Sequence, residues 1–401
     1  MSKGRKELNM NPEVWNDIII KLGEKSKELV LEIDRIRKYI TEDMNNVIDN
    51  LLLFKSNIER YLIKMSDLTK KDCSPLKECV AGVDSSISSP LRIGPYFISA
   101  VSASAVLFFK GPYSEPSKII EVEIAIAPEK SDPEYALKEL QLKMFELEVN
   151  MLEKAFSYLS RNCQGGYVFL DGPIVDPPKF VILRGLRERY YEYIKRRSNI
   201  ISKGFKENIK VIGFVKRVLG SFLHSKIKEL GKLKTLNDYT LVTLILQGIM
   251  GELIRKHIKR VKGSDYDAII MTKPFELDEK KTDYKLYKEQ KVHVFFFYLL
   301  NGLFDYSRRV ARIEFALSST GSNEELAKLT WDISKLVYSW TMPGQPYPLP
   351  IILAHRSCVI PKRTSKKLLK EALTRYMTHV LKSSVNLDAS LSISLSSQLI
   401  S

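Results

Sequence analysis

The stretch Cys79-Val80-Ala81-Gly82-Val83-Asp84 is a short apolar run that ends in an acid, and it predicts a buried strand. Two apolar runs follow at residues 96–109 and 119–126, rich in Ile, Val, Phe and Ala and bounded by Gly and Pro clusters, as neighbouring antiparallel strands would be. Residues 133–159 contain no helix breaker after Pro133 and predict a helix. Residues 167–170 then predict a further buried strand, so the order is three strands, a helix and a strand.

Beyond this stretch, similar patterns continue. Residues 180–210 are basic, aromatic and helical in pattern, and residues 239–261 and 365–381 predict two more helices. The further strands are expected at residues 211–215, 267–271, 292–300 and 310–317. Because no repeat or long linker interrupts these elements, residues 76–382 predict one α/β domain, followed by a Ser- and Leu-rich tail at 383–401.

Residues 12–66 predict one long helix or two helices in a hairpin. The apolar positions recur at steps of three and four, which is the spacing of a single helical stripe; they are Leu29, Ile33, Ile36, Ile40, Met44, Val47, Leu51, Phe54, Ile58, Leu62 and Met65. The stripe either packs on the rest of the chain or forms a coiled-coil or dimer contact. Because the pattern breaks near Ser74-Pro75, we expect residues 1–75 to be an N-terminal helical extension.

The composition favours a polyanionic partner. The 401 residues include 63 Lys and Arg against 47 Asp and Glu, a formal net charge of +16. Such a surplus suits nucleic acid, because each neutralised phosphate releases a condensed counterion; the alternative is a soluble protein that is merely basic. The four cysteines form no C-x-x-C pair, and no segment is apolar enough to span a membrane, so we expect a cytoplasmic protein without a structural zinc site or a disulfide scaffold.

Two acids follow apolar strands, Asp84 in Val-Asp-Ser-Ser and Asp171 in Leu-Asp-Gly-Pro. A carboxylate at the end of a buried strand is held on a rigid element, as a ligand of Mg²⁺ or Mn²⁺ must be. The alternative for each is that it opens a turn or caps a helix.

A third acid lies on the helix between them. Glu148 falls inside the apolar stripe of that helix, four residues from Met144 and from Leu152, whereas Glu146 and Glu153 fall on its polar side. An inward-facing Glu is costly unless it is paired or binds a metal, so Glu148 is the candidate ligand, with an ion pair to a nearby Lys or Arg as the alternative.

Two basic side chains and one basic segment complete the candidates. His355 ends the run Leu349 to Ala354 and is suited to bind a metal or move a proton, unless it is a satisfied structural histidine. Lys216 ends a strand, where it would meet a phosphate oxygen or remain solvated. Basic residues interleaved with tyrosines between residues 184 and 197 would track single-stranded DNA by charge and stacking, unless they form a solvated helix face. They are Arg184, Arg187, Arg189, Lys195, Arg196, Arg197, Tyr190, Tyr191 and Tyr193.

An ordered set of motifs resembles the NurA nuclease family over residues 76–365. The motifs are Val-Asp-Ser-Ser, Phe-Leu-Asp-Gly-Pro, Gly-Phe-Val-Lys, Phe-Phe-Phe-Tyr with Arg312-Ile313-Glu314, and Tyr-Pro with Leu-Ala-His. The chain departs from the family in having Ser85 where Asp-Gly-Ser is usual, and residues 1–70 have no clear counterpart.

The resemblance implies an RNase H-like mixed β-sheet flanked by helices and a metal-dependent deoxyribonuclease. Asp84, Glu148, Asp171 and His355 would bind Mn²⁺ or Mg²⁺, with Tyr347 completing the site and Lys216 contacting phosphate. The implied activity is 5′-to-3′ exonuclease and single-stranded endonuclease cleavage during resection of double-strand breaks. The implied partners are single-stranded DNA, duplex ends and a hexameric HerA-type translocase, as in archaeal DNA-end processing and homologous recombination, with the chain as a homodimer.

Two alternatives stay open. One is a non-catalytic DNA-binding or scaffolding protein in which Ser85 marks a decayed site. The presence of Asp84, Asp171 and His355 argues against this alternative. The other is an RNase H-like ribonuclease that acts on RNA or hybrid duplexes. The relative cleavage of single-stranded DNA, RNA and hybrid separates the three functions.

Overall fold

The computed structural model describes most of the predicted domain. The described ranges are residues 78–93, 95–128, 133–176, 185–216, 269–277, 283–301, 310–342 and 347–361, with short pieces elsewhere. The chain divides into two compact units, Met1–Tyr61 and Leu62–Ser401, and the strands and helices named below belong to the second. In the first unit the described residues are Glu24 and Leu31, both helical.

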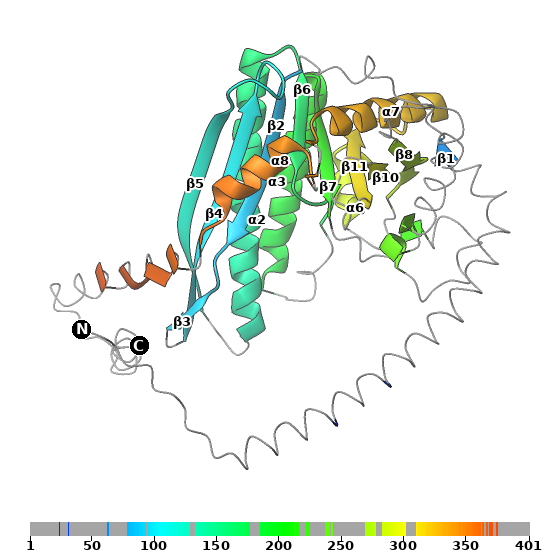
Figure 1. Ribbon diagram of the computed structural model, residues 1–401. Helices are drawn as coiled ribbons and strands as arrows, with labels where there is room; N and C mark the ends of the chain where they lie inside the picture. The colour runs from blue at the N-terminus through cyan, green and yellow to red at the C-terminus, as the bar shows by residue number, and fades with distance from the viewer. Residues whose placement is uncertain are drawn as a thin grey trace. The chain divides into compact units, whose positions relative to one another are not determined.

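One half of the sheet contains the strands that the sequence predicts between residues 79 and 215 (Figure 1). Strand β2 (Val80–Ile87) pairs antiparallel with β4 (Tyr96–Phe108), which pairs antiparallel with β5 (Ser117–Pro128) and with the short β3 (Leu91–Ile93). On its other side β2 pairs parallel with β6 (Gly166–Leu170), and β6 pairs parallel with β7 (Ile209–Val215). The connection between β5 and β6 is the helix α2 (Pro133–Asn162).

The other half of the sheet is antiparallel. β7 pairs with β11 (Val310–Leu317), β11 with β10 (His293–Asn301), and β10 with β8 (Ile269–Thr272) and β9 (Phe275–Glu276). β8 pairs with β1 (Leu62–Ile63), so the described strands form one eleven-stranded sheet. The expected mixed α/β sheet flanked by helices is confirmed.

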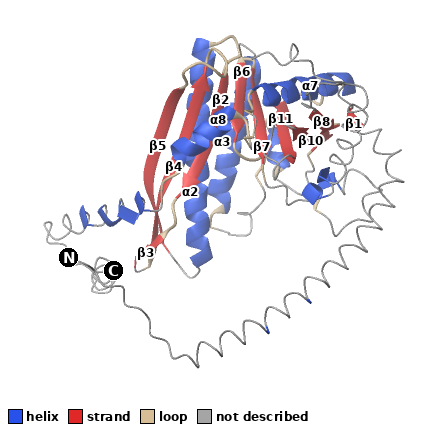
Figure 2. Ribbon diagram, viewed as in Figure 1, coloured by secondary structure: helices blue, strands red, loops and turns tan. Residues whose placement is uncertain are grey.

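Helices cover both faces of this sheet (Figure 2). α2 packs on β2 and β4, and α3 (Arg187–Lys206) packs on α2 and β7. The opposite face of β2 and β4 is covered by α8 (Leu349–Cys358), as Figure 1 shows. Two further helices, α6 (Tyr284–Glu289) and α7 (Asn323–Ser339), pack on the antiparallel half. Because α2 and α8 cover both faces of β4, eleven consecutive residues of this strand are buried, and the three serines among them are hydrogen-bonded to the backbone.

Some predictions need correction or lie outside the described residues. Leu62 was expected in the N-terminal helix, but with Ile63 it forms β1, opposite Thr272 and Met271, so a helix to residue 66 is wrong. The rest of the expected N-terminal helix, most of the helix at 239–261 and the tail at 383–401 lie outside the described residues. The sequence analysis missed α6 and α7, although α7 begins with a capping box in which Ser322 accepts from the backbone of Glu325.

Two further features bear on the sequence predictions. Cys79, just before β2, forms a disulfide with Cys163, just after α2, and the sequence analysis did not anticipate this cross-link. Within the described part of the chain, no helix is long and apolar enough to cross a membrane.

Candidate active site

Asp84 is the most central of the predicted site residues. It lies within β2 rather than at the end of the strand, opposite Ser104 of β4, and is 5% exposed. Its Oδ1 accepts from the backbone N–H of Ser85 at 2.8 Å, and its Oδ2 lies 2.7 Å from His355 Nδ1. The turn-opening alternative is therefore wrong for Asp84, which sits in the interior of a strand with its carboxylate turned toward α8.

The position of His355 depends on how closely α8 packs on the sheet. A Cβ atom on Gly82 would lie 2.2 Å from the carbonyl oxygen of Pro350, so only glycine permits this approach. Ser104 donates to the carbonyl oxygen of Ala354 at 2.7 Å, and Ser102 donates to that of Cys358. The sheet thus holds the backbone of α8 at both sides of His355.

Asp171 lies beside Asp84 because β6 runs parallel to β2. Its backbone N–H donates to the carbonyl oxygen of Val83 at 3.0 Å, and its carboxylate pairs with Lys216. His355 Nδ1 is 3.8 Å from Asp171 Oδ2. Burial, and next the negative charge of Asp84, raise the pKa of Asp171 to about 6. Two acids and an imidazole therefore converge from three elements.

Lys216 and Tyr347 form one wall of this cluster. Lys216 follows β7, and its Nζ lies 4.1 Å from the centre of the Tyr347 ring. Tyr347 in turn packs edge-on against Phe214, with ring centroids 5.7 Å apart. Lys216 is thus paired rather than solvated, and its ammonium lies next to an acid of the site.

Glu148 approaches from the other face of the sheet, on α2. Its side chain is 12% exposed, against 29% for Glu146 and 49% for Glu153, which agrees with its place in the apolar stripe. The ion pair expected as the alternative is present, since Arg197 Nη2 lies 3.6 Å from Glu148 Oε1. Burial raises the pKa of Glu148 to about 7, and the charge of Asp84 contributes. Glu148 is joined to β2 through the Ser85 hydroxyl, which donates to its Oε2 at 2.6 Å, and among the described residues it is not part of the group of ligand atoms formed by Asp84, His355 and Cys358.

The segment after β6 is held in place by three residues that have no role among the sequence predictions. Buried Glu314 of β11 accepts from the backbone N–H of Ile174 at 2.7 Å, and Tyr287 donates to the carbonyl oxygen of Ile174 at 2.8 Å. Arg312 pairs with Glu314 at 2.7 Å. These contacts fix the segment that begins with Asp171. The motif Arg312-Ile313-Glu314 drew attention to Glu314 in the sequence. Its contact with Ile174 could not be predicted, because the two residues are 140 positions apart and meet only once the strands have paired.

The donor set suits a divalent cation. Among the described residues, Asp84, His355 and Cys358 offer ligand atoms that all lie within 4.8 Å of one another. Carboxylate oxygens and imidazole nitrogen suit Mn²⁺, and carboxylate oxygens suit Mg²⁺. Cys358 Sγ lies 3.4 Å from Asp84 Oδ2, and burial raises the pKa of its thiol, which keeps it a neutral neighbour of the acids. The sequence analysis missed Cys358, which lies three residues after His355 on α8.

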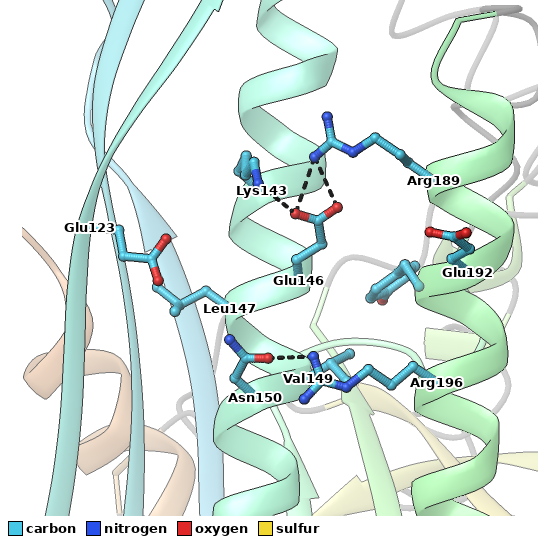
Figure 3. Close-up of a pocket in the computed structure, with 10 residues that line it drawn as sticks. Glu123, Lys143, Glu146, Leu147, Val149, Asn150, Arg189, Glu192 and Arg196 are labelled. Atoms are coloured by element: carbon cyan, nitrogen blue, oxygen red, sulfur yellow. Dashed lines mark hydrogen bonds and ion pairs between the residues drawn. The ribbon is translucent and has the colours of Figure 1, made fainter.

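The structure bears out only part of the expected DNA-tracking segment: Arg187, Lys195 and Arg196 are exposed, and Arg184 lies outside the described residues. Tyr190, Tyr193 and Arg197 are buried, so their part in that interpretation is wrong. Figure 3 shows the pocket of about 330 Å³ between α2 and α3, where Arg189 pairs with Glu146, and Arg196 donates to Asn150. Glu146 and Asn150 of α2 thus accept hydrogen bonds from the two arginines of α3 that line this pocket.

The solved structures that match this chain resemble it only distantly. No curated protein sequence matches the chain. Among solved structures, endonuclease V of Ciona intestinalis in complex with DNA is 14% identical, with 82% of this chain and 98% of that chain covered and a TM-score of 0.29. The catalytic domain of human endonuclease V is 13% identical, with 81% and 98% covered and a TM-score of 0.30.

The family model named NurA domain matches residues 78–360. This range begins just before β2 and ends just after α8, so it includes all the strands and helices that contribute Asp84, Glu148, Asp171, Lys216, Tyr347 and His355. The chain belongs to the NurA family.

Proposed function

We propose that this nuclease is a metal-dependent enzyme that cleaves DNA, with its active site at Asp84, Asp171 and His355. The observation that carries the proposal is that the carboxylates of Asp84 and Asp171 both approach His355 Nδ1, at 2.7 and 3.8 Å, with side chains that are 7% and 8% exposed. Like charges this close repel each other unless a cation or proton lies between them. A divalent cation at this place would neutralise the charge of the phosphate under attack.

Asp84, Asp171 and His355 would hold Mn²⁺ or Mg²⁺, with Glu148 as a further ligand. A bound divalent ion supplies an activated water and stabilises the leaving oxygen of the phosphodiester. Lys216 is placed to contact a phosphate oxygen once a metal or substrate loosens its pairing with Asp171. Tyr347, beside Lys216, would border the scissile phosphate and orient it.

The substrate class follows from charge. The net charge of +16 favours a polyanion, held through its backbone without base readout. We assign DNA ends and single strands, cleaved by 5′-to-3′ exonuclease and single-stranded endonuclease activity, as the substrates in double-strand-break resection. The alternatives are an RNase H-like ribonuclease and a non-catalytic DNA-binding member.

One set of assays separates these functions. Full-length protein with Mn²⁺ is given single-stranded DNA, duplex DNA, RNA and an RNA–DNA hybrid. We expect cleavage of DNA that EDTA abolishes and Mn²⁺ restores. Asp84→Ala or Asp171→Ala should abolish cleavage and leave DNA binding largely intact, since the loss is of metal and not of basic surface. Full activity in either variant, or undiminished activity in EDTA, contradicts this site.

We further propose that residues 1–75 serve assembly, either as a homodimer or with a HerA-type translocase. The nine apolar positions of the stripe that precede β1, from Leu29 to Ile58, need a partner surface. Since β1 begins at Leu62, the matched deletion removes residues 1–61 and keeps β1. Light scattering with and without the translocase should show a soluble nuclease that has lost its dimer or its partner. An insoluble product, or a soluble one with unchanged assembly, contradicts the proposal.

A further inference from the structure

Glu148 is a largely buried acid whose two carboxylate oxygens have different partners. The Ser85 hydroxyl donates to Oε2 at 2.6 Å, and the guanidinium of Arg197 lies 3.6 Å from Oε1. A buried carboxylate loses the hydration that stabilises its charge, so these two contacts determine where it sits. Neither partner is among the residues assigned above to metal or substrate.

Arg197 connects Glu148 to the segment after Asp171. Its side chain is 2% exposed, its Nη1 donates to Asp176 Oδ2 at 2.7 Å, and its Nη2 donates to the carbonyl oxygen of Pro173 at 3.0 Å. The planar guanidinium offers its donors in a fixed geometry, so it can hold several acceptors at once. One side chain of α3 thereby fixes α2 relative to the segment that begins with Asp171.

Ser85 makes the corresponding connection to Asp84. Successive residues of a strand point to opposite faces, so Asp84 faces α8 while Ser85 faces α2. The backbone N–H of Ser85 donates to Asp84 Oδ1 at 2.8 Å, while its hydroxyl donates to Glu148. Two atoms of one residue thus contact two of the acids, across the plane of the sheet.

We propose that Ser85 and Arg197 are positioning residues that hold Glu148 at a fixed place relative to Asp84 and Asp171 and so set the metal affinity of the site. This inference rests on the proposed metal-dependent function. Groups that orient a metal ligand without touching the metal typically change metal affinity or activity by 10- to 100-fold when they are removed. A glycine at position 85 would lack the hydroxyl that donates to Glu148.

The test measures Mn²⁺ binding to the full chain, with free Mn²⁺ followed by electron paramagnetic resonance. Ser85→Ala should raise the dissociation constant about tenfold with little change in Tm, and Ser85→Thr, which keeps a hydroxyl, should recover most of the affinity. Arg197→Lys should weaken binding as well. Arg196→Gln is the matched control, because Arg196 lies on the same helix, is half exposed and pairs with Glu153; it should bind as the unmodified protein does.

A second arm distinguishes positioning from general stabilisation. In a Glu148→Gln background, Ser85→Ala should cause no further loss of Mn²⁺ affinity, because its effect passes through Glu148. The inference is overturned if Ser85→Ala binds Mn²⁺ normally, or if it weakens binding equally in both backgrounds. Unchanged Mn²⁺ binding in Asp84→Ala would instead overturn the proposed metal site itself, so the two failures give different results.

Discussion

His355 Nδ1 lies 2.7 Å from Asp84 Oδ2, although 271 residues separate the two along the chain. This hydrogen bond raises the pKa of His355, while burial raises the pKa of Asp171 to about 6 and that of Glu148 to about 7. Without metal, the cluster therefore holds protons in weakly acidic solution that it releases as the pH rises.

The first prediction concerns metal affinity and pH. Since a metal must displace the protons on these groups, we expect Mn²⁺ to bind at least about tenfold more weakly near pH 6 than near pH 8. Titration with Mn²⁺ at several pH values measures this dependence. An affinity that does not change with pH over this range would contradict the assigned ligands.

The same pKa shifts determine whether the free energy of unfolding rises or falls with pH. The carboxyl pKa values lie above those of the unfolded chain, so between about pH 4 and 7 the folded protein binds more protons and its free energy of unfolding falls as the pH rises. The stabilising charge of His355 is likewise lost as the pH rises through its raised pKa. We therefore expect Mn²⁺ to increase the Tm more near pH 8 than near pH 5.5, as measured by thermal unfolding.

The second prediction compares three acids of α2. Glu148→Gln should reduce cleavage by about 100-fold or more, whereas Glu146→Gln and Glu153→Gln should stay within about threefold of the unmodified protein. Glu146 pairs with Arg189, and Glu153 with Arg196, on the more exposed side of the helix. Because Gln has nearly the same shape as Glu, the initial cleavage rates of the three variants report the effect of removing each negative charge. Equal tolerance of all three changes would show that another residue is the ligand.

The third prediction concerns the packing of α8. Gly82→Ala would place a methyl group 2.2 Å from the carbonyl oxygen of Pro350, so α8 must move. We expect a loss of stability of about 1–3 kcal/mol and a larger loss of cleavage than of DNA binding, because His355 moves with the helix. Thermal unfolding and cleavage rates measure the two effects, with Ile87→Val, a conservative change at a partly buried position of the same strand, as the control. Full activity of Gly82→Ala would show that the position of α8 is not critical.

The sequence predicted the features of this site that depend on local patterns, but not the contacts between residues far apart in the chain. The strands β2, β4 and β6 were predicted because burial on both faces favours continuous apolar runs, β5 because it is rich in β-branched residues although it is largely exposed, and α2 because it has no internal breaker. The inward direction of Glu148 could be inferred from its own helix. Its link to Ser85 could not, because the two residues are 63 positions apart.

The basic helix α3 shows the same limit. Its arginines and tyrosines have the composition of a nucleic-acid surface, and periodicity alone does not reveal that Arg197 is buried. Acids on other elements, Asp176 and Glu148, make that burial favourable. Likewise α8 begins next to two prolines, which suggest a break, but a proline in the first turn of a helix costs no hydrogen bond.

The last prediction concerns the disulfide between Cys79 and Cys163. It closes a loop with a sequence separation of 84 residues, and a cross-link of that span stabilises the fold by about 2–4 kcal/mol, mainly by restricting the unfolded chain. Cys79 precedes β2, and five strand residues to Asp84 correspond to about 16 Å, so the cross-link does not touch the site. We therefore expect the double variant Cys79→Ser, Cys163→Ser to have a lower Tm but the same cleavage rate at a temperature where both proteins are folded.

A reductant should lower the Tm of the unmodified protein to that of the variant and leave the Tm of the variant unchanged. An equal Tm for both proteins in oxidising buffer would show that the two cysteines are not joined in solution, and a lost cleavage rate in the folded variant would show that this end of β2 does control the position of Asp84.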